Sequence, residues 1–288
     1  MKLEKIIVIG AGTMGQGIAQ WFAQQHLFVE LVDVNYDFAK ESLLRIHQSL
    51  DKLTGSKKIT EEDSIKIKNS IVVKKLSDID KNADLAIEAI IENMEAKLNL
   101  FKELDRVLKP EAIIASNTSS FSITKMASSV SEARKMRFVG IHFFNPATIM
   151  KLVEVISGVE SDNTLTHSLI EWFNHHHKVA CMCKDSPGFI VNRVARNFYG
   201  EALRAAGHFN ENKFREIDQV MKEVGGFKMG PFELMDMIGI DVNFSVTESV
   251  YHATFGEERF KPHALQRDMV NAHRLGRKTK KGFYSYDS

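Results

Sequence analysis

Short runs of consecutive apolar residues alternate with segments of helical spacing along the first part of the chain. The apolar runs occupy residues 5–9, 28–32, 85–91, 112–115, 138–143 and 152–156. Unbroken runs of this length are typical of strands that are buried on both faces. Helical spacing falls between several of them, notably over residues 97–108. The alternation predicts an α/β fold, a doubly wound parallel sheet with helices on both faces.

The pattern changes after Lys184. Turn-forming residues follow at 185–189, and helical spacing then dominates over residues 190–206, 214–224, 231–238 and 241–254. We therefore predict two domains, a sheet domain over residues 1–184 and an all-helical domain over residues 185–288. Within the first domain, residues 43–67 are polar, lysine-rich and helical in spacing, with a break at Thr54-Gly55-Ser56. They predict an exposed helical excursion.

Composition narrows the class of protein. The 288 residues carry a net charge of only +1, which argues against a nucleic-acid partner, because such a partner calls for a basic stripe. No apolar run approaches the roughly 20 residues that span a bilayer, and the first residues lack signal-peptide architecture, so no membrane association is expected. Cys181 and Cys183 are the two cysteines. They exclude a disulfide framework and fit a cytoplasmic location.

A glycine-rich turn follows the first apolar run. Gly10-Ala11-Gly12-Thr13-Met14-Gly15 has G-x-G-x-x-G spacing between a predicted strand and a predicted helix, and Asp33 ends the next strand. In a Rossmann-type domain these glycines allow the tight turn, the approach of a pyrophosphate and close helix packing. Asp33 would bind the ribose hydroxyls and repel a 2′-phosphate. We predict that the turn binds NAD in preference to NADP. The alternative is a strand–helix turn without a ligand.

One histidine and one carboxylate stand in the later apolar runs. His142 and Glu154 lie at the ends of adjacent predicted strands, and Asn145-Pro146 between them favours a turn, so the two side chains can meet. Histidine exchanges protons near neutral pH, and a carboxylate on its far ring nitrogen fixes the tautomer. The alternative is a hydrogen-bonded core histidine. A proton-transfer site in a chain that binds NAD predicts a dehydrogenase.

Further motifs cover essentially the whole chain. They lie at residues 10–19, 88–93, 115–120, 142–146, 151–156, 184–193, 229–234, 276–279 and 282–284. In this order they resemble the short-chain L-3-hydroxyacyl-CoA dehydrogenase family, most of all its bacterial 3-hydroxybutyryl-CoA type. The chain departs from the family pattern at Ala147-Thr148, at Lys280 and by two extra residues between Ser119 and His142. None of these departures removes an expected catalytic side chain.

The resemblance implies a role for each matching position. His142 would take the proton of the 3-hydroxyl as hydride leaves C3, and Glu154 would orient His142. Ser119 and Asn192 would hold the substrate oxygens, which implies an active site in the cleft between the domains. From the residues alone, Ser119 is better explained as a turn-forming serine and Asn192 as a helix-surface residue. The implied contacts with the nicotinamide half of NAD are Glu92, Lys97, Asn145 and Lys278.

The lysine-rich excursion carries the remaining binding predictions. The resemblance implies that Lys57 or Lys58 contacts the coenzyme A phosphates and that Ser49 contacts the substrate; a solvated helix face is the alternative. No metal site is predicted. The histidines at 175–177 point in different directions on a helix, and Cys181-x-Cys183 is too closely spaced for paired zinc ligands.

These features together predict reversible, NAD-dependent oxidation of L-3-hydroxyacyl-CoA to 3-oxoacyl-CoA, with a short acyl chain such as 3-hydroxybutyryl-CoA. One rival is a dehydrogenase for a dicarboxylic substrate such as 3-hydroxyadipyl-CoA, although no basic partner for the tail carboxylate stands out in the sequence. Another is a non-catalytic protein that binds NAD or acyl-CoA, against which the retained site residues argue. The apolar stretch at 229–240 predicts a homodimer, as in the family.

Overall fold

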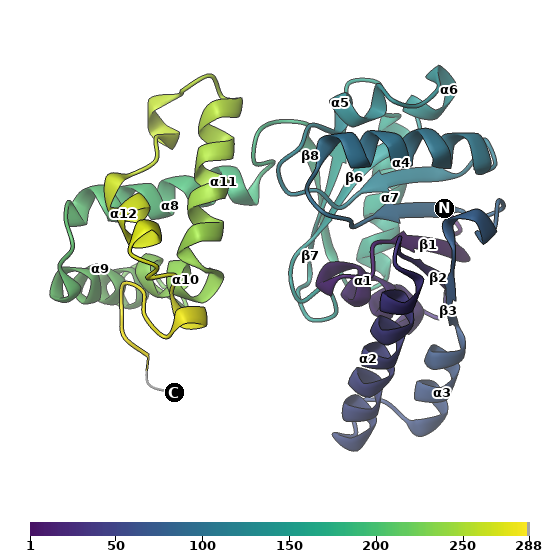
Figure 1. Ribbon diagram of the computed structural model, residues 1–288, viewed down its shortest axis with the longest axis horizontal. Coiled ribbons are helices and arrows are strands. Elements are labelled where there is room, and N and C mark those ends of the chain that lie inside the picture. The colour runs from purple at the N-terminus through teal and green to yellow at the C-terminus, as the bar shows by residue number, and fades with distance from the viewer. Residues whose placement is uncertain (287–288) are drawn as a thin grey trace. The chain divides into compact units, whose positions relative to one another are not determined.

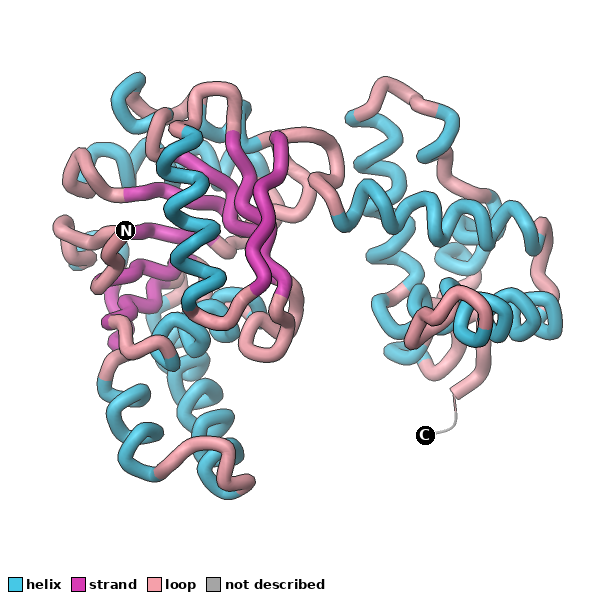
Figure 2. The backbone as a smooth tube through the Cα atoms, turned by 180° about the vertical axis from the view of Figure 1, so that it is seen from behind, coloured by secondary structure: helices cyan, strands magenta, loops and turns pink. Residues whose placement is uncertain are grey.

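The computed structural model describes residues 1–286 and divides the chain into two compact units, Met1–Ser186 and Pro187–Ser288. The first unit is a sheet with helices on both faces, and the second is built from helices and their connections (Figures 1 and 2). Among the described residues, no helix is long and apolar enough to cross a membrane. The predicted fold class, a Rossmann-type sheet followed by a helical domain, is confirmed.

Within residues 1–286, eight strands form one sheet in the order β3-β2-β1-β4-β5-β6-β7-β8. They are β1 (Lys5–Ile9), β2 (Phe28–Val32), β3 (Ile71–Lys74), β4 (Leu85–Glu88), β5 (Ile113–Ser116), β6 (Phe138–Phe143), β7 (Leu152–Ser157) and β8 (Val179–Lys184). Strands β1 to β6 are parallel to one another, β7 is antiparallel to β6, and β8 is parallel to β7. The prediction of a parallel sheet is therefore wrong for these two strands. Residues 144–151 are too short a connection for the crossover that a parallel strand needs.

Helices cover both faces of this sheet (Figures 1 and 2). They are α1 (Thr13–Gln24), α2 (Tyr36–Gly55), α3 (Glu61–Asn69), α4 (Met94–Val107), α5 (Ile123–Ala127), α6 (Glu132–Lys135) and α7 (Asn163–His175), with a 3-10 turn η1 (Leu76–Asp78). On one face, an aromatic cluster joins α1 and α7 to Phe143 of β6. On the other, Phe101 of α4 packs edge-on against Phe138 at 4.8 Å. Because neighbouring strand residues point to opposite faces, His142 points toward the α4 face.

The lysine-rich excursion forms α2 and α3, which lie side by side and project from the sheet (Figure 1). Asn35 caps α2 by accepting a hydrogen bond from the backbone N–H of Phe38, and Thr60 caps α3 in the same way. Side-chain caps of this kind satisfy backbone donors that the helix itself leaves unpaired. The first helix ends at Gly55, within the predicted break.

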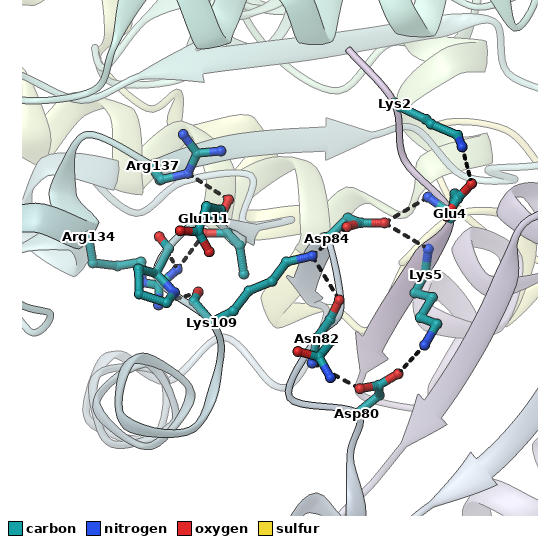
Figure 3. Close-up of polar contacts among 12 residues, drawn as sticks. Lys2, Glu4, Lys5, Asp80, Asn82, Asp84, Lys109, Glu111, Arg134 and Arg137 are labelled. Atoms are coloured by element: carbon teal, nitrogen blue, oxygen red, sulfur yellow. Dashed lines mark hydrogen bonds and ion pairs between the residues drawn. The ribbon is translucent and has the colours of Figure 1, made fainter.

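The amino-terminal edge of the sheet is closed by ion pairs and hydrogen bonds (Figure 3). The Asp84 carboxylate, just before β4, accepts hydrogen bonds from the backbone N–H of Glu4 at 2.8 Å and from Lys109 Nζ at 2.7 Å. Lys5, which begins β1, pairs with Asp80 at 2.5 Å. These contacts tie neighbouring strands together where they start. The opposite edge of the sheet, where the parallel strands end, is the edge at which ligands of such sheets bind.

The second unit packs its helices around buried aromatic rings. The helices are α8 (Val191–Ala206), α9 (Glu211–Glu223), α10 (Pro231–Ile238), α11 (Ile240–Ala253) and α12 (Ala264–Asn271), with 3-10 turns η2 (Glu258–Phe260) and η3 (Arg277–Thr279). Phe214, Phe232 and Phe283 pack together at the centre. The buried Asp218 carboxylate caps α10 by accepting the backbone N–H groups of Phe232 and Glu233, both at 2.9 Å.

Candidate active site

The turn between β1 and α1 requires glycine at two positions and is open at a third. Gly10 has a φ of +105°, and a Cβ there would lie 2.4 Å from the carbonyl oxygen of Ala89. A Cβ on Gly15 would lie 1.7 Å from the carbonyl oxygen of Gly10. At Gly12, by contrast, an added Cβ would meet nothing within 4 Å. The backbone of Gly12 therefore faces open space, as the approach of a pyrophosphate requires.

A cavity of about 850 Å³ opens beside this turn and is lined by Gly10, Gly12 and Asp33 among others. The Asp33 carboxylate accepts the backbone N–H groups of Ala11 at 2.8 Å and Asn35 at 3.0 Å, so neutral donors fix it at the end of β2. Lys75, just after β3, also lines the cavity, which the sequence analysis missed. The open glycine, the cavity and the fixed carboxylate fit a dinucleotide with unmodified ribose hydroxyls.

His142 and Glu154 face each other across the hairpin formed by β6, β7 and residues 144–151, here called the His142 hairpin. The strand register pairs them directly, and His142 Nδ1 lies 2.7 Å from Glu154 Oε2. His142 is 7% exposed and Glu154 is fully buried. Directly opposite residues of an antiparallel pair have neighbouring side chains, so the expected meeting follows from the antiparallel turn. Because Nδ1 of His142 is engaged with the Glu154 carboxylate, Nε2 is the ring nitrogen that exchanges a proton with a substrate.

Two residues that the sequence analysis did not single out hold the His142 hairpin in place. Asn117, just after β5, accepts the backbone N–H of Phe143 through Oδ1 at 2.8 Å. Lys178 Nζ donates to the carbonyl oxygens of Ala147 at 2.5 Å and Met150 at 2.7 Å, in the connection between the two strands. Burial lowers the pKa of Lys178 to about 8. Asn117 lies in the family motif at residues 115–120, whereas nothing in the sequence points to Lys178.

A buried ion pair lies at the end of β4. Lys97 of α4 is 1% exposed, and its Nζ lies 2.5 Å from Glu88 Oε1 and 3.1 Å from Glu92 Oε2. Glu88 is fully buried and also accepts a hydrogen bond from Ser116 Oγ at 2.6 Å. Lys97 and Glu92 were predicted as site residues, whereas Glu88 was not. The feature of the sequence that could have pointed to Glu88 is its position as a carboxylate inside the otherwise apolar run at residues 85–91.

Hydroxyl groups of the loop after β5 complete the contacts of Glu92. Thr118 and Ser120 both donate to Glu92 Oε1, the latter at 2.9 Å. Burial disfavours ionisation of Glu92, but Lys97 and these hydroxyls outweigh it and hold the pKa of the carboxyl below its ordinary value. Ser119, the predicted substrate contact, lies half-buried between Thr118 and Ser120. The ion pair thus reaches the loop that carries Ser119.

The remaining predicted residues lie on several elements of the two units. Asn145 is exposed in the connection of the His142 hairpin, and Ser49 is half-buried on α2. Lys57 and Lys58 are exposed just after that helix ends. In the second unit, Asn192 is half-buried in the first turn of α8.

Lys278 lies on η3 and is engaged within its own unit, with Nζ 2.6 Å from Asp241. The residues that were set aside as metal ligands belong to regular elements: His175 ends α7, and Cys181 and Cys183 lie on β8. Burial raises the pKa of both thiols. A protonated thiol is a poor metal ligand and a poor nucleophile.

Parallel strands bring these features to one edge. Because β1, β4, β5 and β6 run in the same direction, the dinucleotide turn, Glu88, Asn117 and His142 all lie at or near the carboxyl edge of the sheet. Ligands of such sheets bind at that edge. A dinucleotide turn together with a carboxylate-oriented histidine defines a nicotinamide-dependent dehydrogenase.

Comparison with known proteins identifies the family. Residues 5–186 match the 3-hydroxyacyl-CoA dehydrogenase NAD binding domain, and residues 188–286 match the C-terminal domain of the same family. The chain belongs to the 3-hydroxyacyl-CoA dehydrogenase family. The predictions of NAD as cofactor and of an oxidoreductase are thereby confirmed.

Individual relatives cover the whole chain. A probable 3-hydroxybutyryl-CoA dehydrogenase of Bacillus subtilis is 38% identical over 100% of this chain and 99% of its own length. The 3-hydroxyadipyl-CoA dehydrogenase of Escherichia coli is 39% identical over 99% of this chain, which spans 60% of that protein. The crystal structure of the (S)-3-hydroxybutyryl-CoA dehydrogenase of Ralstonia eutropha is similar with a TM-score of 0.92 at 38% identity, covering 100% of both chains.

Proposed function

We propose that the protein reversibly oxidises short-chain L-3-hydroxyacyl-CoA to 3-oxoacyl-CoA with NAD, with 3-hydroxybutyryl-CoA as the representative substrate. The observation that carries this proposal is the 2.7 Å contact between His142 Nδ1 and Glu154 Oε2 at the sheet edge that also carries the dinucleotide turn. The names of the Bacillus subtilis and Ralstonia eutropha relatives support the short acyl chain.

The oxidation removes a hydride and a proton from the substrate. The C3–H bond breaks with its electron pair, the O–H proton passes to His142 Nε2, and the C3–oxygen double bond forms. NAD⁺, when bound, supplies the hydride acceptor. Glu154 stabilises the imidazolium that results, and a general base of this kind contributes about 10²–10⁴-fold in rate. Ser119 and Asn192 are proposed donors to the 3-oxygen, on which charge develops.

The proposed cofactor and coenzyme A contacts rest on placement and charge. Gly12 and Asp33 line the dinucleotide cavity. Glu92 and Lys97 are held beside the loop after β5 by their ion pair, and we place them, with Asn145 and Lys278, at the nicotinamide half. Lys57 and Lys58 are exposed cations that suit the coenzyme A phosphates, and Ser49 on α2 is proposed as a substrate contact.

A second candidate substrate, 3-hydroxyadipyl-CoA, shares the reacting carbons and differs in the carboxylate that ends its acyl tail. The name of the Escherichia coli relative supports it. So does Arg196 of α8, a buried arginine whose hydrogen-bond acceptors are all neutral. The two candidates therefore differ in what the end of the acyl tail meets.

An NADH oxidation assay with acetoacetyl-CoA tests the function. We expect turnover with acetoacetyl-CoA and little with free acetoacetate, which has the same reacting carbonyl but lacks coenzyme A. NADPH should be a poor substitute for NADH. An absence of NADH oxidation at high enzyme concentration would support the non-catalytic binding protein instead.

We also propose that the protein is a homodimer and acts in the cytoplasm. Met237, Ile238 and Val242 of the second unit are 47%, 40% and 48% exposed, and neighbouring exposed apolar side chains favour a subunit contact. Light scattering at micromolar concentration tests the dimer, and a monomer would contradict it. The cytoplasmic location is supported by the presence of only two cysteines, because proteins of the reducing cytoplasm rarely depend on disulfides.

A further inference from the structure

Arg196 of α8 is a buried cation that meets no carboxylate. It is 5% exposed. Nε donates to the backbone carbonyl oxygen of Asn192 at 3.1 Å, and Nη1 donates to the carbonyl oxygen of Asn243 and to Thr247 Oγ1, both at 2.8 Å. In the part of the chain that the structure describes, no acidic side chain lies within ion-pair distance of the guanidinium. The charge is therefore surrounded by neutral oxygen atoms and by the ring of Tyr199, whose centroid lies 5.1 Å from Cζ.

Hydrogen-bonding capacity remains at this cluster of Arg196, Asn243 and Thr247. A guanidinium has five N–H donors, and the three on Nε and Nη1 are used. Among residues 1–286, the two on Nη2 have no acceptor. The side-chain amide Nδ2 of Asn243, 1% exposed, also lacks an acceptor among these residues. A buried donor without an acceptor is costly, and Asn243 Nδ2 is one. Arg196 Nη2 is not among the fully buried atoms that lack a partner, so its hydrogens are accessible to water or to a ligand.

The surroundings do not supply the missing anion. A small cavity of about 10 Å³ beside the guanidinium is also lined by Arg259, Lys261 and His263, and none of the described residues that line it is acidic. Space of this size holds about one water molecule. Arg259 and Lys261 are paired with Glu257 and Glu258, so among the described residues Arg196 is the cation beside this space that lacks a carboxylate. A carboxylate that binds there displaces the water-sized volume, needs the lining side chains to move apart, and neutralises the charge.

Lys178 shows why an arginine at this position differs from a lysine. Lys178 is also buried among backbone carbonyls, and burial lowers its pKa to about 8. A lysine in such a place can lose its proton and become neutral. Burial lowers the pKa of Arg196 only to about 10, and a guanidinium stays charged at neutral pH. Arg196 therefore stays positively charged, and an anion that binds beside it would compensate that charge.

The position of Arg196 relates it to the substrate. Arg196 lies four residues after Asn192, one turn along the same helix face, and its side chain folds back so that Nε reaches the Asn192 carbonyl. One helical turn rises about 5.4 Å. In a six-carbon acyl chain, the terminal carboxyl carbon lies three carbon–carbon bonds from C3, a span of about 4 Å. A tail carboxylate can thus reach the guanidinium when Asn192 holds the 3-oxygen.

We infer that Arg196 binds a carboxylate at the end of the acyl tail, and that the enzyme therefore accepts 3-hydroxyacyl-CoA thioesters with an ω-carboxylate of about six carbons. This inference rests on the proposed function, and in particular on Asn192 as a contact of the 3-oxygen. The unused Nη2 hydrogens donate to the carboxylate, as arginine does in charge-assisted pairs. Arg196 acts as a specificity residue, remote from the atoms that react.

Two substrates of equal length separate the tail contact from the reaction. 3-Hydroxyadipyl-CoA and 3-hydroxyhexanoyl-CoA differ only in a terminal carboxylate or methyl group. We expect the wild-type enzyme to prefer the carboxylate in kcat/KM by about 10- to 100-fold, the size of a hydrogen bond to a charged group. In Arg196→Met, kcat/KM should fall by a similar factor for 3-hydroxyadipyl-CoA and stay within about twofold for 3-hydroxyhexanoyl-CoA.

Arg204→Met is the matched control, because Arg204 is an exposed arginine of the same helix that pairs with Glu201. It should leave both substrates unchanged. Equal wild-type kcat/KM for the two substrates, or a preference for the methyl tail, would overturn the inference even if Arg196→Met fails to fold. An equal loss with both substrates in a folded Arg196→Met would overturn it as well, leaving Arg196 as a tie between helices. Failure of the proposed function is a different result, in which neither substrate nor 3-hydroxybutyryl-CoA is oxidised.

Discussion

Two buried cations, one in each unit, are satisfied in different ways. Lys97 lies 2.5 Å from the fully buried carboxylate of Glu88 and also pairs with Glu92. Arg196 meets two backbone carbonyls, a hydroxyl and the ring of Tyr199, all of them neutral. A buried charge that has its counter-charge is complete in the folded chain, whereas one among neutral acceptors remains poorly compensated. On the proposed role of Arg196, the difference separates a contact that the folded chain completes by itself from one that a substrate completes.

The largest expected effect comes from breaking another completed pair of the first unit, His142 with Glu154. His142→Ala removes the proposed base, and kcat should fall by about 10²–10⁴-fold, with the Kd for NADH nearly unchanged. Steady-state kinetics and an NADH fluorescence titration measure the two quantities. His167→Ala, at an exposed histidine of α7, is the control and should behave as wild type.

Glu154→Gln divides the roles within that pair. The amide keeps the shape of the carboxylate but cannot stabilise the imidazolium, so kcat should fall less than in His142→Ala and the pH profile should shift. Wild-type turnover in Glu154→Gln would reduce Glu154 to a structural residue. Full activity of His142→Ala would remove the proton-transfer site from the proposal.

The next effect concerns stability and sets the two cations directly against each other. Lys97→Met leaves the buried Glu88 without its main counter-charge and should lower the free energy of unfolding by about 3–5 kcal/mol. Arg196→Met breaks no ion pair and removes a charge that is costly to bury, so it should change that free energy by about 1 kcal/mol or less. Urea unfolding at neutral pH measures both values.

Lys102→Met supplies the control for this comparison, because Lys102 is an exposed lysine on α4 and its loss should be nearly neutral. In the double variant Glu88→Gln/Lys97→Met, no unpaired charge is left at Glu88, so part of the stability should return. The contrast fails if Lys97→Met and Arg196→Met destabilise the protein equally. Arg196 would then belong with Lys97 as a completed structural contact.

The same contrast explains how far the sequence could predict this molecule. Strands β1, β2 and β6 match their predicted bounds, because unbroken apolar runs between turn residues have a strong local signal. The half-exposed edge strand β8 (Val179–Lys184) is not among the predicted apolar runs, because its residues alternate weakly and its pairing with β7 is a tertiary contact. The direction of β7 depends on the length of the connection before it, which the apolar pattern does not contain.

Contacts of the site could be predicted from the sequence where the two partners lie close together in the chain. His142 and Glu154 belong to one hairpin, so spacing alone brought them together. Glu88 and Lys97 lie on different elements, and only the packing of α4 against the sheet shows that they pair. Arg196 meets Asn243 and Thr247 of α11 through the fold of the second unit. No local pattern in the sequence could reveal that contact.

Asp33 is intermediate between Lys97, which has a counter-charge, and Arg196, which has none among the described residues. Its carboxylate is held by backbone N–H groups and lines the dinucleotide cavity. Wild type should prefer NADH over NADPH, and Asp33→Asn should reduce this preference in kcat/KM by about tenfold, because the repulsion of a 2′-phosphate is lost. Lys75→Met is the counterpart, since Lys75 lines the same cavity, and it should increase the preference. Equal or better kcat/KM with NADPH in wild type would contradict the role of Asp33.

The smallest effect is expected at Glu92, where the charge is paired but its side chain is 39% exposed. Its pKa in the folded protein lies below the ordinary 4.5, where Lys97 and the hydroxyls of Thr118 and Ser120 outweigh the effect of burial. The ionised form therefore stabilises the fold fully above about pH 4.5, and this contribution is lost as the pH falls through the folded pKa. Wild type should exceed Glu92→Gln in free energy of unfolding by roughly 1 kcal/mol or less after solvent screening. The difference should shrink at about pH 3.5, where urea unfolding shows whether the two proteins converge. A difference that stays constant down to that pH would mean that shape and hydrogen bonding, and not charge, hold Glu92 against Lys97.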